Sequence, residues 1–262
     1  MPNPVREVRV ITQNSNDPGY VNRIMVATPT LGRVRIEWFS ARYGQTVPPN
    51  WSMVQMVQFM NAMMPIQYLV ADAQNIIARE ALDKDIEWLL LWEDDVLPRP
   101  DLFMRLNEYM RDGTIPIVSG LYFTKSEPSE PMVYRGRGNS YYTKWKLGDK
   151  VWVDGVPTGM LLIHNSIIRA LWDESPEYQV DSRTTTRRVF NTPNKQWFDI
   201  TSGVYNNVTG TSDLEWCTRI IENGIFKKAG WPEFQKKKYP FLIDTNLFCQ
   251  QIDMEGRRYP NI

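Results

Sequence analysis

Three carboxylates stand side by side in the stretch EWLLLWEDDVLPRPD, which spans residues 87–101. Glu93, Asp94 and Asp95 follow an unbroken apolar run, and two prolines come soon after them. Adjacent carboxylates repel one another, so a fold gains nothing by clustering them unless a cation or a ligand is present. Mg²⁺ and Mn²⁺ take oxygen ligands, and Mg²⁺ often bridges carboxylates to substrate phosphates. The triplet therefore predicts either a divalent metal site or a solvated acidic turn before a helix.

The segments around the triplet alternate between strand and helix. Strands are predicted at 23–30, 51–59, 88–92 and 115–123, and helices are predicted at 35–44, 71–85 and 100–111. Asp72 is the expected N-cap of the second helix. This alternation favours an α/β fold with a mostly parallel sheet that carries helices on both faces. Ligands of such sheets bind beyond the carboxyl ends of the strands, which is where the triplet is expected to lie.

The second half of the chain is less regular. The pattern predicts a hairpin-rich insertion at 124–155, a turn, buried segment and short helix at 156–171, a long loop at 173–210, and one or two strands at 240–253. Residues 211–224 predict a well-marked helix, with Ser212 and Glu215 as a capping box and Gly224 as its stop.

Composition narrows the class of protein. The chain has 262 residues with thirty basic and thirty acidic side chains, so its net charge argues neither for nor against a polyanionic partner. Two cysteines, Cys217 and Cys249, are too few for a disulfide framework and have apolar neighbours, which predicts buried thiols. No signal-peptide pattern and no membrane-spanning run is visible. These features predict a soluble, cytoplasmic protein.

The order of five segments resembles the family-2-like glycosyltransferases of GT-A fold. The segments are RIMVATPT, NIIAREALDKDIEWLLLWEDDV, VPTGMLLI, TSDLEWCTRIIENG and DTNLFCQQID, and the match covers roughly residues 23–123 and 153–253 with gaps. The resemblance implies a single GT-A (Rossmann-like) domain over residues 1–262. It would comprise an N-terminal arm at 1–22, a nucleotide-sugar-binding half at 23–123, a smaller irregular acceptor-side half at 124–253 and a tail at 254–262.

The resemblance also implies an activity, a cofactor and roles for the triplet. The activity would be metal-dependent transfer of a sugar from a UDP- or GDP-sugar to a glycan or other hydroxyl acceptor, with Mn²⁺ or Mg²⁺ as cofactor. The triplet matches the family's Asp-x-Asp motif. Asp95 would hold the metal, and Glu93 and Asp94 would face the ribose and the metal's water shell. The loop that cradles the nucleobase is matched by Thr28, Pro29 and Thr30.

Three further positions match the family's pattern in whole or in part. Arg79 matches the Arg of an Ala-Arg-Asn signature. Asp213 matches the acid of a Glu-Asp pair and would be the general base of an inverting transfer, kept ionised at the start of a helix by the helix dipole. Gln251 stands where many relatives carry a metal-ligating His, and its amide oxygen would replace the imidazole. The only histidine, His164, is expected to be structural or to lie on the acceptor side.

Alternative functions remain open at the level of sequence. A nucleotidyltransferase also ends a strand on acids, although TPTLGRVR has one glycine where a Gly-rich phosphate loop is usual. A non-catalytic glycosyltransferase-like module that binds a glycan or nucleic acid is a further candidate. Residues 134–146 interleave cations with aromatics and 183–188 add arginines, which suits a phosphate-bearing acceptor, a sugar or a nucleic acid base as well as it suits a solvated hairpin.

Overall fold

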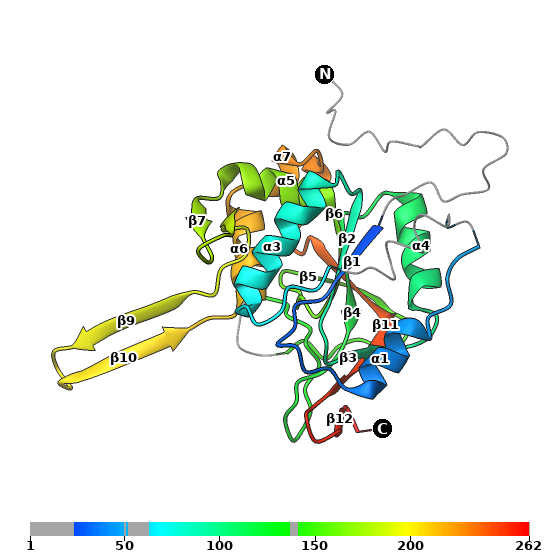
Figure 1. Cartoon of the computed structure of the whole chain (residues 1–262), viewed down its shortest axis with the longest axis horizontal. Coiled ribbons are helices and arrows are strands. Elements are labelled where there is room, and N and C mark those ends of the chain that lie inside the picture. The colour runs from blue at the N-terminus through cyan, green and yellow to red at the C-terminus, as the bar shows by residue number, and fades with distance from the viewer. Residues whose placement is uncertain (1–23, 50, 52–62, 137–140, 262) are drawn as a thin grey trace.

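The computed structural model describes residues 24–49, 51, 63–136 and 141–261. Within them, a sheet of eight strands occupies the centre (Figure 1), in the order β1-β2-β6-β4-β11-β12, with β3 and β5 also paired to β11. Its strands are β1 Ile24–Ala27, β2 Trp88–Trp92, β3 Val96–Pro98, β4 Ile117–Leu121, β5 Lys150–Val153, β6 Met160–His164, β11 Phe241–Ile252 and β12 Arg258–Tyr259. The predicted α/β class is confirmed.

Four strands of the sheet's core run in one direction, and β6 opposes them. β1 pairs with β2 in parallel, and β4 pairs with β11 in parallel. β6 lies between β2 and β4 and is antiparallel to both. Because β1 and β2 are parallel neighbours, the residues that follow Ala27 and Trp92 emerge at the same edge of the sheet.

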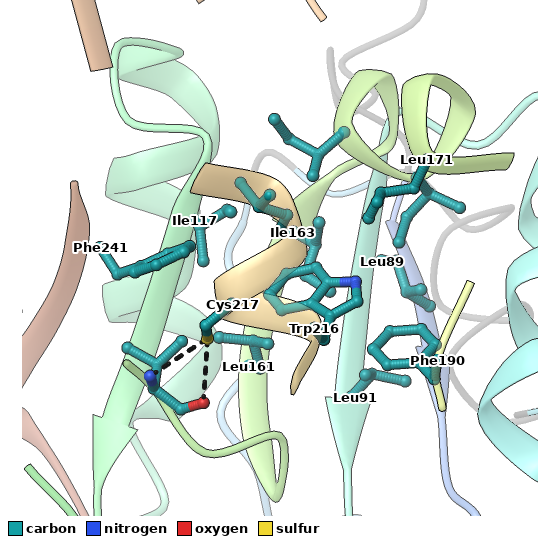
Figure 2. Close-up of a cluster of buried hydrophobic side chains, with 14 of the residues drawn as sticks. Leu89, Leu91, Ile117, Leu161, Ile163, Leu171, Phe190, Trp216, Cys217 and Phe241 are labelled. Carbon is teal, nitrogen blue, oxygen red and sulfur yellow. Dashed lines mark hydrogen bonds between the residues drawn. The ribbon is translucent and has the colours of Figure 1, made fainter. Parts of the chain in front are cut away.

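Helices cover both faces of the sheet (Figure 1). One face carries α3 Val70–Asp83, α5 Asn165–Glu174, α6 Ser212–Glu222, α7 Ile225–Lys228 and α8 Pro232–Gln235, and the other carries α1 Ile36–Tyr43 and α4 Leu102–Asp112. Strand β2 supplies both cores, because its side chains alternate between the faces. Leu89 and Leu91 pack into one core and Leu90 into the other. Figure 2 shows the first core, where Trp216 stacks on Phe190 with 5.4 Å between ring centroids.

Most predicted elements are confirmed, with boundaries that shift by a few residues. The apolar positions expected to face inward on α4 are buried, namely Leu102, Phe103, Leu106 and Met110, and α4 ends at Gly113 with φ 61°. Segment 240–253 forms a single strand, β11. The strand predicted at 51–59 lies outside the described residues apart from Trp51.

Both predicted capping arrangements are wrong. Asp72 lies in the first turn of α3 and not at its N-cap, and its Oδ1 accepts a hydrogen bond from the Tyr178 hydroxyl at 2.6 Å. Ser212 is the first helical residue of α6, because Thr211 occupies the N-cap. Glu215 forms an ion pair at 3.2 Å one turn further along its own helix. Asp72 thus has a distant side-chain partner that local spacing does not specify, whereas Glu215 pairs with Arg219, four residues along the same helix.

The long loop predicted at 173–210 is also wrong. This segment contains two hairpins, β7 Glu177–Gln179 with β8 Thr185–Arg187, and β9 Asn194–Asp199 with β10 Val204–Thr209. The second hairpin projects away from the body of the molecule (Figure 1). A strand that does not cover a core has no buried face, so its sequence lacks the alternation by which strands are recognised.

Two sequence-based expectations, on the cysteines and on membrane-spanning helices, can be compared with the structure. Cys217 and Cys249 are both buried, and no disulfide joins them. In the portion of the chain that the structure describes, none of the helices has the length and apolar character needed to cross a lipid bilayer.

Candidate functional site

The acidic triplet occupies a backbone turn that three other elements hold in place. Strand β2 is fully buried, and the chain turns directly after it. The amide of Glu93 donates to the carbonyl of Gly159 at 2.9 Å, and its carbonyl accepts from the indole N–H of Trp38 at 2.9 Å. The carbonyl of Asp95 accepts from the amide of Ile252 at 2.8 Å. The carboxylates are therefore mounted on a fixed part of the backbone, since α1, β11 and the turn before β6 all bind it.

Glu93 directs its carboxyl group toward Gly159 and Tyr122. A Cβ atom at Gly159 would lie 2.5 Å from the Tyr122 hydroxyl oxygen and 2.9 Å from Glu93 Oε2, so both oxygens approach one point that a side chain would fill. The Gly159 amide donates to the Tyr122 hydroxyl at 2.7 Å. This contact leaves the Tyr122 proton available to an acceptor. Glycine is therefore required at position 159 for these groups to meet.

The electrostatics of Glu93 connect it with Asp213. Burial, followed by repulsion from Asp95, Asp213 and Asp94, raises the pKa of Glu93 to about 8. Burial, followed by the negative charges of Glu93 and Asp213, raises the pKa of Tyr122 well above its usual value. Asp213 lies in the first turn of α6, more than a hundred residues further along the chain, and its charge nevertheless contributes to the raised pKa of Glu93. The family resemblance had assigned Asp213 and the triplet to one site, and the role of Asp213 as the base stays a prediction.

Asp213 itself departs from one expectation. Burial is the largest influence on its carboxyl group and raises its pKa, against the direction expected from the helix dipole. Hydrogen bonds oppose this effect, among them the one from the Leu214 amide to Asp213 Oδ1 at 2.8 Å. Because the side chain is 9% exposed, desolvation outweighs the dipole that acts on solvated helix ends.

The loop predicted to cradle a nucleobase lies against the triplet. Thr30 donates its hydroxyl hydrogen to Asp94 Oδ2, and the same hydroxyl accepts from the Gly32 amide at 3.0 Å. Burial raises the pKa of Asp94, and the bond from Thr30 partly offsets that effect. Thr28 is fully buried, and its hydroxyl oxygen has no hydrogen-bond partner among the described residues. Pro29 is buried between these two threonines.

Asp95 is paired with a cation that the sequence did not single out. Lys125 Nζ forms an ion pair with Asp95 Oδ2, and the two side chains are 34% and 29% exposed. The charge of Lys125 also opposes the rise in the pKa of Glu93 and of Asp94, which places the ammonium group close to the whole triplet. Asp95 Oδ1 is buried and has no hydrogen-bond partner in the described part of the chain.

The donor set fits a dedicated divalent metal poorly. Gln251 lies on β11 directly opposite Val96, the residue after Asp95, and is buried. However, no three His, Cys, Asp or Glu side chains among the described residues are arranged to hold a metal. One oxygen of Asp95 is already neutralised by Lys125. The Mn²⁺ or Mg²⁺ implied by the resemblance therefore stays a prediction, and the ion pair argues against it.

Two other predicted residues make contacts away from the triplet. Arg79 Nη1 donates to the carbonyl of Thr185 on β8 at 2.6 Å, so this guanidinium binds the β7–β8 hairpin. His164 is the N-cap of α5, with Nδ1 2.8 Å from the Ser166 hydroxyl and its ring edge-on to Trp88 at 4.9 Å. His164 is buried, as expected of a structural residue.

A cavity that none of the triplet residues lines lies elsewhere on the molecule. Its volume is about 820 Å³, and it is bounded by α1, β3, β11 and the turn at 147–148. Arg99, Arg258 and Gln250 line it. Because side chains alternate across a strand, Gln250 and Gln251 point to opposite sides of β11, so this cavity and the triplet are separate sites. Volume alone does not identify the reactive site, whereas the clustered carboxylates carry chemistry.

The basic-aromatic segment at 134–146 is partly described. The Arg135 guanidinium lies over the rings of Tyr142 at 4.7 Å and Tyr239 at 4.3 Å. Arg137 lies outside the described residues. Burial raises the pKa of Tyr134, with a further contribution from the charge of Asp213, so this segment begins beside the carboxylates. That position suits an acceptor-side role, although Arg135 is engaged with rings of the chain itself.

Comparisons with known proteins find only distant structural similarity. No family model matches it, and no curated protein matches it. The structure of A197 from STIV is 15% identical with a TM-score of 0.49, over 89% of this chain and 87% of that one. S. aureus TarS is 9% identical with a TM-score of 0.37, over 59% of this chain and 30% of TarS. A glycosyltransferase involved in the glycosylation of the major capsid of PBCV-1 is 12% identical with a TM-score of 0.29, over 58% and 66%. These distant likenesses carry no conclusion about chemistry.

Proposed function

We propose that this chain is a glycosyltransferase of GT-A type that takes a sugar from a nucleoside diphosphate donor. The observation that supports it most is the convergence of three separately predicted parts at one edge of the sheet. Thr30 follows β1 and bonds to Asp94, which follows β2, and Asp213 of α6 lies within electrostatic range of Glu93. A purely structural acidic turn does not require a polar loop and a second buried acid at the same place.

The donor would lie along the triplet. The loop from Thr28 to Thr30 would lie against the nucleobase, and the Thr28 hydroxyl within it is buried and lacks a hydrogen-bond partner among the described residues. Glu93, whose pKa is raised to about 8, carries its proton at neutral pH and can donate it in a hydrogen bond to a ribose hydroxyl.

The chemical step would be an inverting displacement. The acceptor hydroxyl oxygen attacks the anomeric carbon, the bond from that carbon to the diphosphate oxygen breaks, and the nucleoside diphosphate leaves with the bonding electrons. Asp213 takes the acceptor's proton in this step. Its enclosed position and raised pKa make it a stronger base than a solvated Asp, which suits that role.

The test is to titrate UDP- and GDP-sugars into the full chain and to follow the melting temperature and the release of free sugar. Binding by at least one donor, weakened about tenfold or more in Asp94→Asn, supports the proposal, because that variant alters the contact with Thr30. Asp83→Asn, an exposed position at the far end of α3, is the matched control. If no nucleotide sugar binds with or without Mn²⁺, the proposal is wrong. Binding without release or transfer of sugar instead indicates a non-catalytic binding module.

A further inference from the structure

Lys125 is held in the site by a turn that is hydrogen-bonded on both sides of it. The Thr124 amide donates to the Glu130 carbonyl at 2.9 Å, and the Ser129 hydroxyl donates to the Thr124 carbonyl at 2.7 Å. The Met132 amide donates to the Tyr122 carbonyl at 2.9 Å. The lysine is therefore presented by an ordered segment that continues directly from β4, so its meeting with Asp95 is built into the fold.

The position of the ammonium group matches the place where a metal was expected. Asp95 is the residue that the resemblance assigns to metal binding, and Lys125 forms an ion pair with it. The ion pair is about one third exposed, so a ligand can reach it from solvent. A lysine ammonium is a compact charge with three donors, and it binds phosphate oxygens as a point charge.

We propose that Lys125 is the resident cation of this site and that its ammonium group, held by Asp95, binds the diphosphate of the donor without a divalent metal. The inference rests on the proposed function. Three observations support it: the ion pair itself, the lack of a third acidic, His or Cys ligand among the described residues, and the Gln at position 251 where a metal-ligating His was expected. The single positive charge of Lys125 would thus neutralise part of the diphosphate charge that a divalent ion neutralises in metal-dependent enzymes.

The proposal predicts how diphosphates bind. UDP, GDP and inorganic pyrophosphate are titrated calorimetrically into the full chain in EDTA and then in Mn²⁺. At least one of them is expected to bind wild type equally well in EDTA, within about threefold. Lys125→Met should weaken that binding about 10- to 100-fold, the usual range for loss of one charged hydrogen bond. Lys125→Arg should retain most of it, and Lys84→Met, which removes an exposed ion-paired lysine at the C-cap of α3, should have no effect.

A second measurement does not depend on nucleotide. Mn²⁺ binding is followed by the paramagnetic resonance signal of the free ion. Wild type is expected to hold no stoichiometric Mn²⁺, whereas Lys125→Met frees Asp95 and should bind the ion measurably more tightly. Stoichiometric Mn²⁺ binding by wild type, or diphosphate binding that disappears in EDTA, overturns the inference and leaves the proposed function standing. Absence of diphosphate binding under both conditions overturns both.

Discussion

Replacing Glu93 with Gln should remove most of the pH dependence of folding stability near neutrality. The carboxyl group has a pKa of about 8 in the folded chain because it is enclosed and faces other acids, against an ordinary value near 4.5. Between those values the folded state keeps a proton that the unfolded state has released. The free energy of unfolding therefore falls as pH rises, by about 1.4 kcal/mol per pH unit. From pH 5.5 to pH 7.5 the fall due to this group is about 2–3 kcal/mol, and it ends above pH 8.

Urea unfolding measured by tryptophan fluorescence at pH 5.5, 6.5 and 7.5 tests this reasoning, and the chain carries ten tryptophans as probes. Glu93→Gln has a neutral side chain of nearly the same shape, so its slope against pH should be shallower than that of wild type by about 1.4 kcal/mol per unit. Glu108→Gln, at an exposed position on α4, should follow wild type. Parallel slopes for wild type and Glu93→Gln would show that the carboxyl group is not enclosed as described.

Three further changes have expected outcomes. Gly159→Ala would place a Cβ 2.5 Å from the Tyr122 hydroxyl, so it should lower the free energy of unfolding by about 1–3 kcal/mol in urea titrations and weaken donor binding; an unchanged midpoint would contradict the close approach. Asp213→Asn should abolish sugar transfer while retaining donor affinity within about threefold, as read by product formation and calorimetry, because a base is needed only in the chemical step; full activity would exclude Asp213 as the base. Asn75→Ala should lower the free energy of unfolding by about 2–4 kcal/mol. The Asn75 side chain accepts from the amide of Phe190 at 2.7 Å and donates to its carbonyl at 2.9 Å, and both of these backbone groups are buried. A loss below about 0.5 kcal/mol would show that these two hydrogen bonds do not contribute as expected.

The family resemblance assigned the triplet and the loop at Thr28–Thr30 to one donor site, and the parallel pairing of β1 with β2 in the structure agrees with that grouping. Both segments come directly after buried strands, and neighbouring parallel strands end at the same edge. The bond from Thr30 to Asp94 agrees with that expectation. The place of Asp213 also came from the family resemblance, since no local pattern relates α6 to the end of β2.

Lys125, Tyr122 and Gly159 could not be found in the same way. Tyr122 and Lys125 follow β4, which is not a neighbour of β2, because β6 lies between them. Their approach to the triplet depends on the return of the 122–132 turn, which no periodicity encodes. Strand order depends on pairing between segments that are distant in sequence. Local spacing therefore cannot show which residues the strand order brings together. Gly159 had a weak signal, since it stands in the turn before β6, but its two crowded neighbours are known only from the fold.

The pKa of Asp213 shows a different limit of sequence reasoning. Its place in the first turn of a helix predicts a stabilised charge, and that rule is local. The buried environment comes from packing by other segments and raises the pKa instead. Where a local rule and a burial effect oppose each other, the sequence supplies the first and only the structure supplies the second.

The donor site proposed for this chain is the edge of the sheet at Thr28–Thr30, Glu93–Asp95 and Asp213, where a nucleoside diphosphate sugar would bind. A crystal structure of the full chain with a non-hydrolysable UDP- or GDP-sugar tests this proposal most directly. We expect the nucleobase against Thr28–Thr30, the diphosphate within hydrogen-bond distance of Lys125, and the anomeric carbon on the side of Asp213. A nucleotide bound in the cavity beside Arg99 and Arg258, or a triplet without ligand at saturating donor, would contradict it.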